Sequence, residues 1–170
     1  MRFILAFIIP LIITGCAIPK IVDLKSTFNQ DLTSKLLEKG SNTIKGSALI
    51  RQQGGGVVTC AGIPVGLIPD TEYSRERMLA IYNSDIRGYY PAFGSATVKF
   101  NNTDSGYITY QRKTVCDAQG FFKFDGISDG SFFIVTQIVW GSDTYVKQGG
   151  WIMQRVTVSN GDSKDIVISP

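Results

Sequence analysis

One stretch constrains the fold of this chain more than any other: residues 116–138, which read CDAQGFFKFDGISDGSFFIVTQI. Two clusters of turn residues, DAQG at 117–120 and DGISDG at 125–130, frame a short run that alternates aromatic and polar residues. A longer aromatic and β-branched run follows at 131–138. The order of turn, short strand, turn and longer strand is typical of a β-meander. The stretch therefore predicts an all-β domain.

The same stretch resembles the carboxypeptidase regulatory-like domain family, a group of transthyretin-like and CnaB-like β-sandwiches. The residues that match the family pattern are Asp117, Gly120, Phe122, Phe124, Gly126, Ile127, Gly130 and Phe132. Residues 64–69 also match the second strand of that family, and 70–113 then form an insert. The resemblance implies a Greek-key sandwich of about 7–9 strands. In metallocarboxypeptidases this module is an accessory without catalytic residues, so the resemblance implies a fold and no peptidase activity.

The N-terminus has the pattern of an export signal. A basic start at Arg2 precedes an uncharged run at 3–13 that is too short to span a bilayer comfortably. Residues 13–16, ITGC, resemble the lipobox of bacterial lipoproteins, in which the cysteine carries acyl chains such as palmitate. We therefore expect a signal peptide at 1–15 and a lipidated Cys16, which several acyl chains would hold firmly on a membrane. An ordinary secreted protein and an uncleaved membrane anchor are the alternatives.

The expected lipoprotein signal predicts both the cellular compartment of the protein and the organisation of the mature chain. Ala17 fits the outer-membrane sorting preference of many Gram-negative lipoproteins, so we expect a lipid-anchored protein of the bacterial envelope that faces the periplasm. The mature chain would hold a lipidated tether at 16–42, with an amphipathic helix from about 24 to 38, and a sandwich at 43–170. Cleavage removes one of 17 basic residues and leaves 16 against 14 acidic ones, without a basic run. Nucleic acid is therefore not an expected partner.

Two cysteines, Cys60 and Cys116, remain after lipidation. An even pair in an oxidising compartment predicts a disulfide. Two free buried thiols and a metal pair are the alternatives. The chain has no His, and two thiolates alone make a poor zinc site, so we expect no metal and no cofactor.

The insert at 70–113 contains the residues that we expect to bind a partner. Its pattern predicts a helix over 71–83 that begins at Thr71 or Ser74, then an aromatic loop at 88–94. Two strands at 96–100 and 106–110 are expected to form a hairpin around 101–105. Long inserts on a rigid β-scaffold often carry function, so the possible binding residues are Tyr89, Tyr90 and Phe93. Three aromatic residues outside the insert are Trp140, Tyr145 and Trp151. Core filling and loop anchoring explain them at least as well as a role in binding.

Strands are expected along the rest of the chain. Their ranges are 43–50, 57–62, 63–69, 144–148, 151–159 and 165–168. Glycines at 54–56 are typical of a hairpin, because the Lys-Ser/Thr of a phosphate-binding loop does not follow them. Asn160-Gly161-Asp162 is expected to be a hairpin turn between the last two strands.

No catalytic set emerges from the residues. Without His there is no imidazole general base. Asp117, Asp125 and Asp129 fall in turn sequences, where Asp bonds nearby backbone amides, and Glu72 and Glu76 fall where a helix would begin. An enzyme with an unrecognised carboxylate pair is the least favoured hypothesis.

Two binding hypotheses follow. The first is a non-enzymatic, membrane-anchored interaction or scaffolding module with an envelope protein partner, such as an accessory subunit of a larger envelope or secretion assembly. The alternative is a glycan- or peptidoglycan-binding lipoprotein that uses the same aromatic loop.

Overall fold

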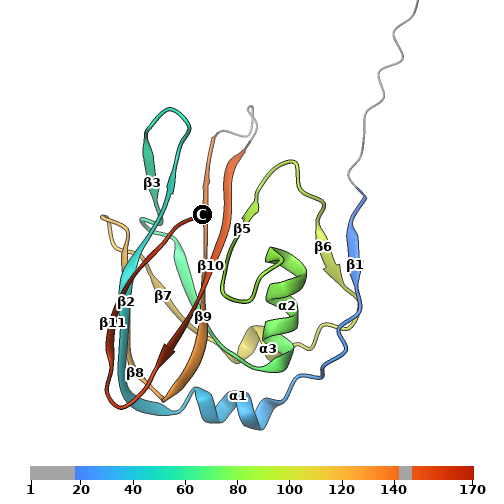
Figure 1. The fold of residues 1–170 in the computed structure, drawn as a ribbon, viewed down its shortest axis with the longest axis vertical. Coiled ribbons are helices and arrows are strands. Elements are labelled where there is room, and N and C mark those ends of the chain that lie inside the picture. Colours follow the sequence, from blue (N-terminus) through green and yellow to red (C-terminus); the bar gives the residue numbers. More distant parts are fainter. Residues whose placement is uncertain (1–17, 142–146) are drawn as a thin grey trace, which may run out of the picture.

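A computed structural model describes residues 18–141 and 147–170, and these fold as a β-sandwich with a third, partial layer (Figure 1). Its helices are α1 (Gln30–Leu36), α2 (Glu72–Tyr82) and α3 (Gly106–Thr109). Its strands are β1 (Lys20–Val22), β2 (Lys39–Arg51), β3 (Val57–Thr59), β4 (Pro64–Pro69), β5 (Arg87–Pro91), β6 (Val98–Phe100), β7 (Arg112–Val115), β8 (Phe121–Ile127), β9 (Gly130–Trp140), β10 (Gln148–Val158) and β11 (Ser163–Ile168). The all-β prediction is confirmed. The expected signal peptide and Cys16 lie outside the described residues.

Two sheets make the sandwich. The larger has five strands in the order β5-β10-β9-β4-β7, and all its neighbours are antiparallel. The smaller has four strands, because β2 pairs in parallel with β11 and antiparallel with both β8 and β3. Beside the five-stranded sheet, β1 and β6 form a separate parallel pair. Among the described residues, no helix is long and apolar enough to cross a membrane.

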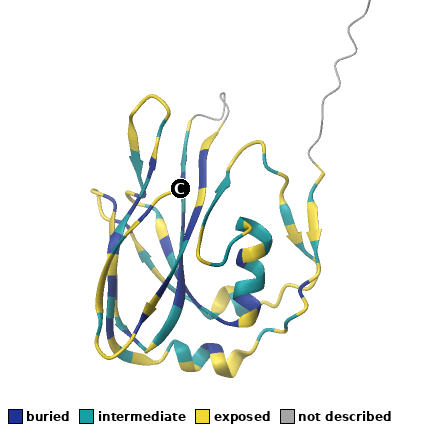
Figure 2. Ribbon diagram, viewed as in Figure 1, coloured by how far each residue is buried: buried dark blue, intermediate teal, exposed yellow. Residues whose placement is uncertain are grey.

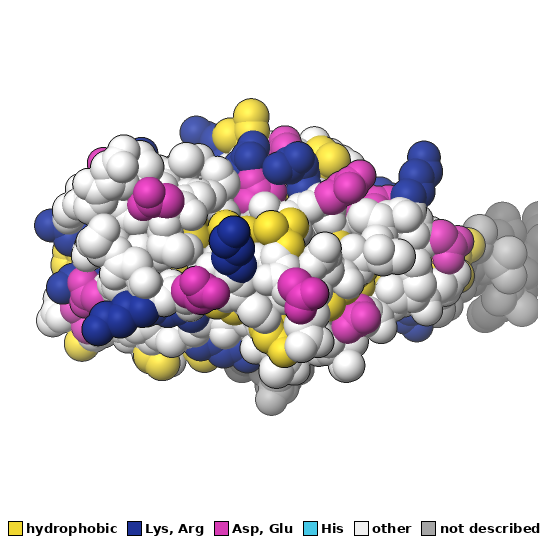
Figure 3. Space-filling view, turned by 90° about the horizontal axis from the view of Figure 1, so that it is seen from below, with side chains coloured by type: hydrophobic (Ala, Val, Ile, Leu, Met, Phe, Trp, Pro, Cys, Tyr) yellow, Lys and Arg dark blue, Asp and Glu magenta, His cyan; other side chains and the backbone are white. Residues whose placement is uncertain are grey.

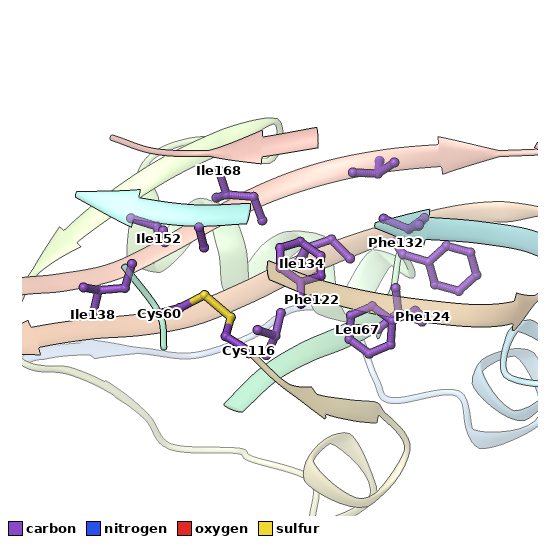
Figure 4. Packing of buried hydrophobic residues seen from close by; sticks show 14 of the residues in the cluster. Cys60, Leu67, Cys116, Phe122, Phe124, Phe132, Ile134, Ile138, Ile152 and Ile168 are labelled. Carbon is purple, nitrogen blue, oxygen red and sulfur yellow. A yellow bond between two sulfur atoms is a disulfide. The ribbon is translucent and has the colours of Figure 1, made fainter. Parts of the chain in front are cut away.

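The main core lies between the two sheets (Figure 4). Side chains alternate along a strand, so Phe132, Ile134 and Ile138 of β9 all point inward and are fully buried. Phe122 and Phe124 of β8 meet them from the smaller sheet. The predicted disulfide between Cys60 and Cys116 is confirmed and lies in this core. It joins the turn after β3 to the residue after β7.

A smaller apolar cluster lies on the outer face of the five-stranded sheet, beneath α2 (Figure 2). Its buried members are Ile68, Met78, Phe133 and Met153. The predicted helix at 71–83 is confirmed. A capping box fixes its start, since Thr71 Oγ1 accepts from the Ser74 N–H at 3.2 Å and Ser74 Oγ accepts from the Thr71 N–H at 2.8 Å.

Strand pairing differs from the sequence-based prediction at two turns. The expected meander is wrong, because β8 pairs with β2 in one sheet while β9 pairs with β4 and β10 in the other. The expected hairpin at 160–162 is wrong as well, because β11 leaves β10 and pairs with β2. That turn is bound to β2, since the Asp162 N–H donates to Asn42 Oδ1 at 2.8 Å. Turn residues specify a chain reversal, but they do not specify whether the flanking strands stay in one sheet.

The insert also differs from its prediction. Residues 106–109 form α3 and not a strand. Ser105 is the N-cap without a side-chain cap bond, and the Asp104 carboxylate accepts the Gly106 N–H at 2.7 Å in the turn before the helix. β6 therefore takes β1 as its partner, and the expected hairpin is wrong. The expected aromatic loop is instead an edge strand over residues 87–91, because β5 pairs with β10.

The N-terminal helix is shorter than expected. Only 30–36 are helical, and Asn29 caps this start by accepting the Leu32 N–H at 2.9 Å. Residues 20–28 instead run along the insert, where α2, β6 and 101–102 bind them. The strand expected at 144–148 lies mostly outside the described residues.

Candidate functional site

The three aromatic residues expected to bind a partner do not form one surface. Tyr89 and Tyr90 are neighbours on β5, so they face opposite sides of the five-stranded sheet. Tyr89 lines a cavity at the end of the sandwich, whereas Tyr90 lines a pocket on the outer face. Phe93 lies in the loop after β5 and is 66% exposed. The structure therefore offers two separate concave surfaces and an isolated exposed ring.

The end cavity has a volume of about 810 Å³ and lies between the β2–β3 hairpin, β5 and β10. Its rings are Tyr89 and Trp140. Both are already bonded within the protein, since the Tyr89 hydroxyl donates to the Gly149 carbonyl at 2.8 Å and Trp140 Nε1 donates to Gln148 Oε1 at 3.1 Å. Burial also raises the pKa of Tyr89. With its aromatic polar groups engaged, this cavity is the weaker candidate.

The outer face carries a row of side chains in register across three strands. Trp151 of β10 lies directly opposite Tyr90 of β5 and directly opposite Gln137 of β9. Neighbouring strands are about 4.8 Å apart, so the row from Tyr90 to Gln137 spans about 10 Å. The three side chains share one face of the sheet, and Trp151 at the centre is 41% exposed. Trp151 is thus partly open to solvent between the Gln137 amide and Tyr90, whose hydroxyl donates to the Ala96 carbonyl.

Two pockets meet at Trp151. The one toward α2 has a volume of about 370 Å³, and the one toward β7 has a volume of about 440 Å³. Trp151, Val135 and Ile68 line both. We name the combined depression the outer groove, and its further lining comprises Arg77, Met78, Ile81, Tyr82, Tyr90, Thr97, Val98 and Tyr107 on one side and Ile63, Pro64, Gly66, Gln111, Lys113 and Gln137 on the other.

Glycines beside the central row give the outer groove its depth. Gly88 of β5 and Gly66 of β4 lie in the row of Met153 and Val135. A Cβ at Gly88 would be 2.5 Å from the Cβ of Tyr82, so only Gly lets that ring approach the sheet. At the other end, a Cβ on Gly66 would be 3.3 Å from Gln111 Oε1. The groove is therefore a shaped depression with a ring over one end and an amide over the other.

The charges in the outer groove are basic. Among its described lining residues, Arg77 and Lys113 are charged and none is Asp or Glu. The Arg77 guanidinium carbon lies 4.0 Å from the centre of the Phe100 ring and 4.4 Å from that of Tyr107, which are cation–π distances. Arg77 Nε is buried without a hydrogen-bond partner among the described residues. Arg77 thus acts mainly as an aromatic-packed cation at the α2 end.

Two tyrosines of the groove, Tyr82 and Tyr107, stay neutral. Burial raises the pKa of Tyr107 to about 12, against a smaller opposite effect of the Arg77 cation. Burial raises the pKa of Tyr82 even further above its ordinary value. At physiological pH both phenols therefore keep their protons and can donate as well as accept hydrogen bonds.

The carboxylates considered in the sequence are dispersed. The Asp70 side chain is 1% exposed and forms ion pairs with Arg75, at 3.0 Å, and with Arg155. Asp117 caps its turn as predicted, since Oδ1 accepts the Gln119 and Phe121 N–H groups at 2.9 Å. Asp125 instead lies within β8 and bonds Thr43 Oγ1 and Lys123. Asp129 Oδ1 accepts from the Asn42 side chain and from the Asn160 N–H. In the described part of the chain, no three His, Cys, Asp or Glu residues gather as a metal site would require.

Sequence reasoning named Tyr90 but missed the rest of the outer groove. The sequence explained Trp151 as well by packing as by binding. No sequence pattern marked Gln137 or Lys113 as binding residues. Alternation indicates that Tyr90, Trp151 and Gln137 each face one side of a strand. It does not indicate that the three strands are neighbours, which only the pairing in the five-stranded sheet reveals.

Comparison with known proteins supports the fold. The chain matches no protein-family model and no curated protein. A solved structure of a candidate carbohydrate-binding protein from Pseudomonas aeruginosa is similar to it, with a TM-score of 0.70 and 23% identity, over 85% of this chain and 99% of that chain. At this identity the likeness concerns the fold alone. A chlorocatechol 1,2-dioxygenase from Pseudomonas putida matches at a TM-score of 0.26 and 10% identity, over 95% of this chain and 70% of that chain, and this match carries no argument.

Proposed function

We propose that this chain is a carbohydrate-binding lipoprotein of the bacterial envelope, which holds a glycan in the outer groove. The single observation that carries the proposal is the registered row of Tyr90, Trp151 and Gln137 on an open sheet face. Acylated Cys16 would anchor it to the outer membrane on the periplasmic side. Its role would be binding and not catalysis.

The chemistry of the groove suits a sugar. The C–H face of a sugar ring is apolar and packs on an aromatic face, while its hydroxyls need donors and acceptors at the rim. Trp151 supplies the face, and Gln137, Gln111 and the neutral tyrosines supply the polar groups. The row is about as long as two linked sugar rings, because three strands at about 4.8 Å spacing span about 10 Å.

The charge of the groove narrows the class of glycan. Lys113 lies at the β7 end, and the described lining holds no acidic residue. A neutral or acidic glycan is therefore favoured over an amino sugar with a free ammonium group. The carbohydrate-binding description of the Pseudomonas aeruginosa protein points the same way, although at that identity it counts for less than the groove itself.

Direct binding tests the proposal. The full-length acylated protein, in detergent, is titrated with purified peptidoglycan sacculi and with soluble envelope polysaccharides of acidic and neutral type. The chain has two Trp residues, so a Trp140→Phe variant leaves Trp151 as the only indole reporter. We expect saturable binding to at least one glycan, with a shift in the emission of Trp151.

The decisive variant is Trp151→Ala, whose affinity is measured by co-sedimentation with sacculi because the substitution removes the indole reporter. An aromatic residue at a binding hot spot contributes about 2 kcal/mol, so we expect affinity to fall about 30-fold. Trp140→Phe in the end cavity is the matched control and should leave affinity unchanged. Unchanged affinity in Trp151→Ala, or no binding to any glycan, would contradict the proposal. Recovery of a stoichiometric envelope protein that Trp151→Ala releases would favour the scaffolding hypothesis instead.

A further inference from the structure

The segment after the expected lipidation site is a fixed part of the folded domain. β1 pairs in parallel with β6, and the main chain adds bonds from the Lys20 N–H to Thr97 O at 2.8 Å and from the Asn101 N–H to Val22 O at 3.2 Å. A sequence that reads as a flexible tether is therefore a strand of the third layer.

Side chains of the insert hold the next residues. The Asn102 amide bonds both main-chain groups of Leu24, at 3.0 and 2.9 Å. The Glu76 carboxylate accepts the Lys25 N–H at 2.8 Å, the Ser26 N–H at 3.0 Å and the Ser26 hydroxyl at 2.6 Å. Leu24 is itself buried. The chain from 20 to 26 is thus bound at successive residues and cannot act as a spacer.

This leaves a very short free tether. Only Ala17, Ile18 and Pro19 separate Cys16 from β1. Four extended steps from Cys16 to Lys20 reach at most about 14 Å. A domain of this size has a radius of gyration of about 15 Å, so the anchored domain cannot stand away from the bilayer.

The surface around the start of β1 suits a lipid interface. Ile18 is 83% and Ile21 61% exposed, and Ile21 lies in register with exposed Lys99. Phe93 is exposed and lies in the β5–β6 loop, and this loop is at the same end of the molecule as the start of β1 (Figure 1). We name Ile18, Ile21, Phe93 and Lys99 the exit face. Lys20 does not belong to it, because its side chain points the other way and Nζ donates to the Ala80 carbonyl of α2 at 3.1 Å. Asp23 at the far end of β1 is bonded to the Asn101 amide.

The opposite end of the molecule is different. Seen from below, it carries hydrophobic side chains among acidic and basic ones (Figure 3). The acidic side chains on this end would be repelled by anionic headgroups. The exit face instead combines exposed apolar side chains with Lys99, whose ammonium group complements anionic headgroups.

We infer that the exit face rests on the membrane surface. The inference deepens the proposed function and rests on its lipid anchor. β6 separates the two surfaces, because Val98 lines the outer groove while the next residue, Lys99, points to the other side and belongs to the exit face. A glycan in the groove would therefore be separated from the membrane contact by this strand.

Depth-dependent quenching tests the inference. The full-length acylated protein carries Trp140→Phe and Trp151→Phe, together with Phe93→Trp, and is reconstituted in vesicles of phosphatidylethanolamine and phosphatidylglycerol with brominated acyl chains. We expect loss of indole emission relative to unbrominated vesicles. The matched control is Ile108→Trp in the same background, because Ile108 is 60% exposed on α3 at the other end of the molecule. Its emission should not change.

A second reporter position controls for the case in which Phe93→Trp alters the conformation of the β5–β6 loop. Ile21→Trp places the indole on β1 and should be quenched like Phe93→Trp. Emission that is unquenched at both positions, or quenched equally at position 108, would overturn the inference. An intact mass without acyl chains would overturn it as well. Glycan affinity and its loss in Trp151→Ala are measured without vesicles, so failure of the groove is distinguishable from failure of the membrane contact.

Discussion

The two faces of the five-stranded sheet carry the same strands but have different neighbours. On β9, Ile134 points into the space between the sheets and is fully buried, whereas the next residue, Val135, lines the outer groove. A second sheet closes the inner face along its length. The outer face is covered by α2 over only part of its width, and Trp151 stays half-exposed beyond it. The inner face therefore provides stability, and the outer face has surface left for binding.

The largest expected effect tests the inner face. Phe132→Ala removes a fully buried ring from the main core. We expect the free energy of unfolding to fall by about 3–5 kcal/mol, because the neighbours cannot fill the cavity. Chemical denaturation followed by circular dichroism measures this change. A loss below about 1 kcal/mol would mean that the core can collapse around the site.

The disulfide belongs to the same inner region. Replacing both Cys60 and Cys116 by Ala should lower the free energy of unfolding by about 2–4 kcal/mol, since the cross-link closes a loop with a sequence separation of 56. Denaturation of the double variant beside the oxidised parent gives the value. Reduction of the parent is the control and should approach the same stability.

The next largest loss of stability is expected at the ion pairs of Asp70, at the start of the insert. Asp70→Asn leaves Arg75 and Arg155 without their buried partner. We expect a loss of about 2 kcal/mol, below the cost of a fully buried pair because both arginines can reach water. Glu72→Gln is the control, because Glu72 is exposed and makes no such pair among the described residues. Equal stability of both variants would contradict this view.

The outer face should tolerate truncation. Val135→Ala is expected to cost about 1 kcal/mol, less than a fully buried site would, because Val135 is only partly buried. Ile134→Ala is the matched inner variant and should cost about 2–5 kcal/mol. Denaturation curves of the pair measure the contrast directly. Equal losses would remove the distinction between the two faces.

The smallest effect concerns pH at the edge of the insert. The Ser26 hydroxyl, and then the N–H groups of Lys25 and Ser26, lower the pKa of Glu76. A carboxylate with a lowered folded-state pKa stabilises the fold fully above its ordinary pKa of 4.5 and loses this contribution as the pH falls through the lower value. Hydrogen exchange at Lys25 and Ser26 should therefore accelerate below about pH 4.5, beyond the intrinsic trend. Glu76→Gln should remove this extra dependence.

Local patterns predicted much of the sandwich, and long-range pairing accounts for the errors. Thr71 and Ser74 specify the start of α2 through bonds within one helical turn, and this start was predicted. The same kind of local reasoning failed at residues 106–109, because these residues form a short helix although their sequence alternates like a strand. The candidate site was predicted only at Tyr90, because its partners Trp151 and Gln137 are more than 40 residues away in the sequence.

The sequence by itself determined the all-β class, the turns and the start of α2, and it predicted the disulfide on the expectation that Cys16 is acylated. These features depend on interactions within a few residues or on simple counting. Only the tertiary structure decided which strands are neighbours, which face of the five-stranded sheet stays open, and that residues 20–26 belong to the domain. Strand partners are chosen by how all the apolar faces can be covered together, and no single segment contains that information.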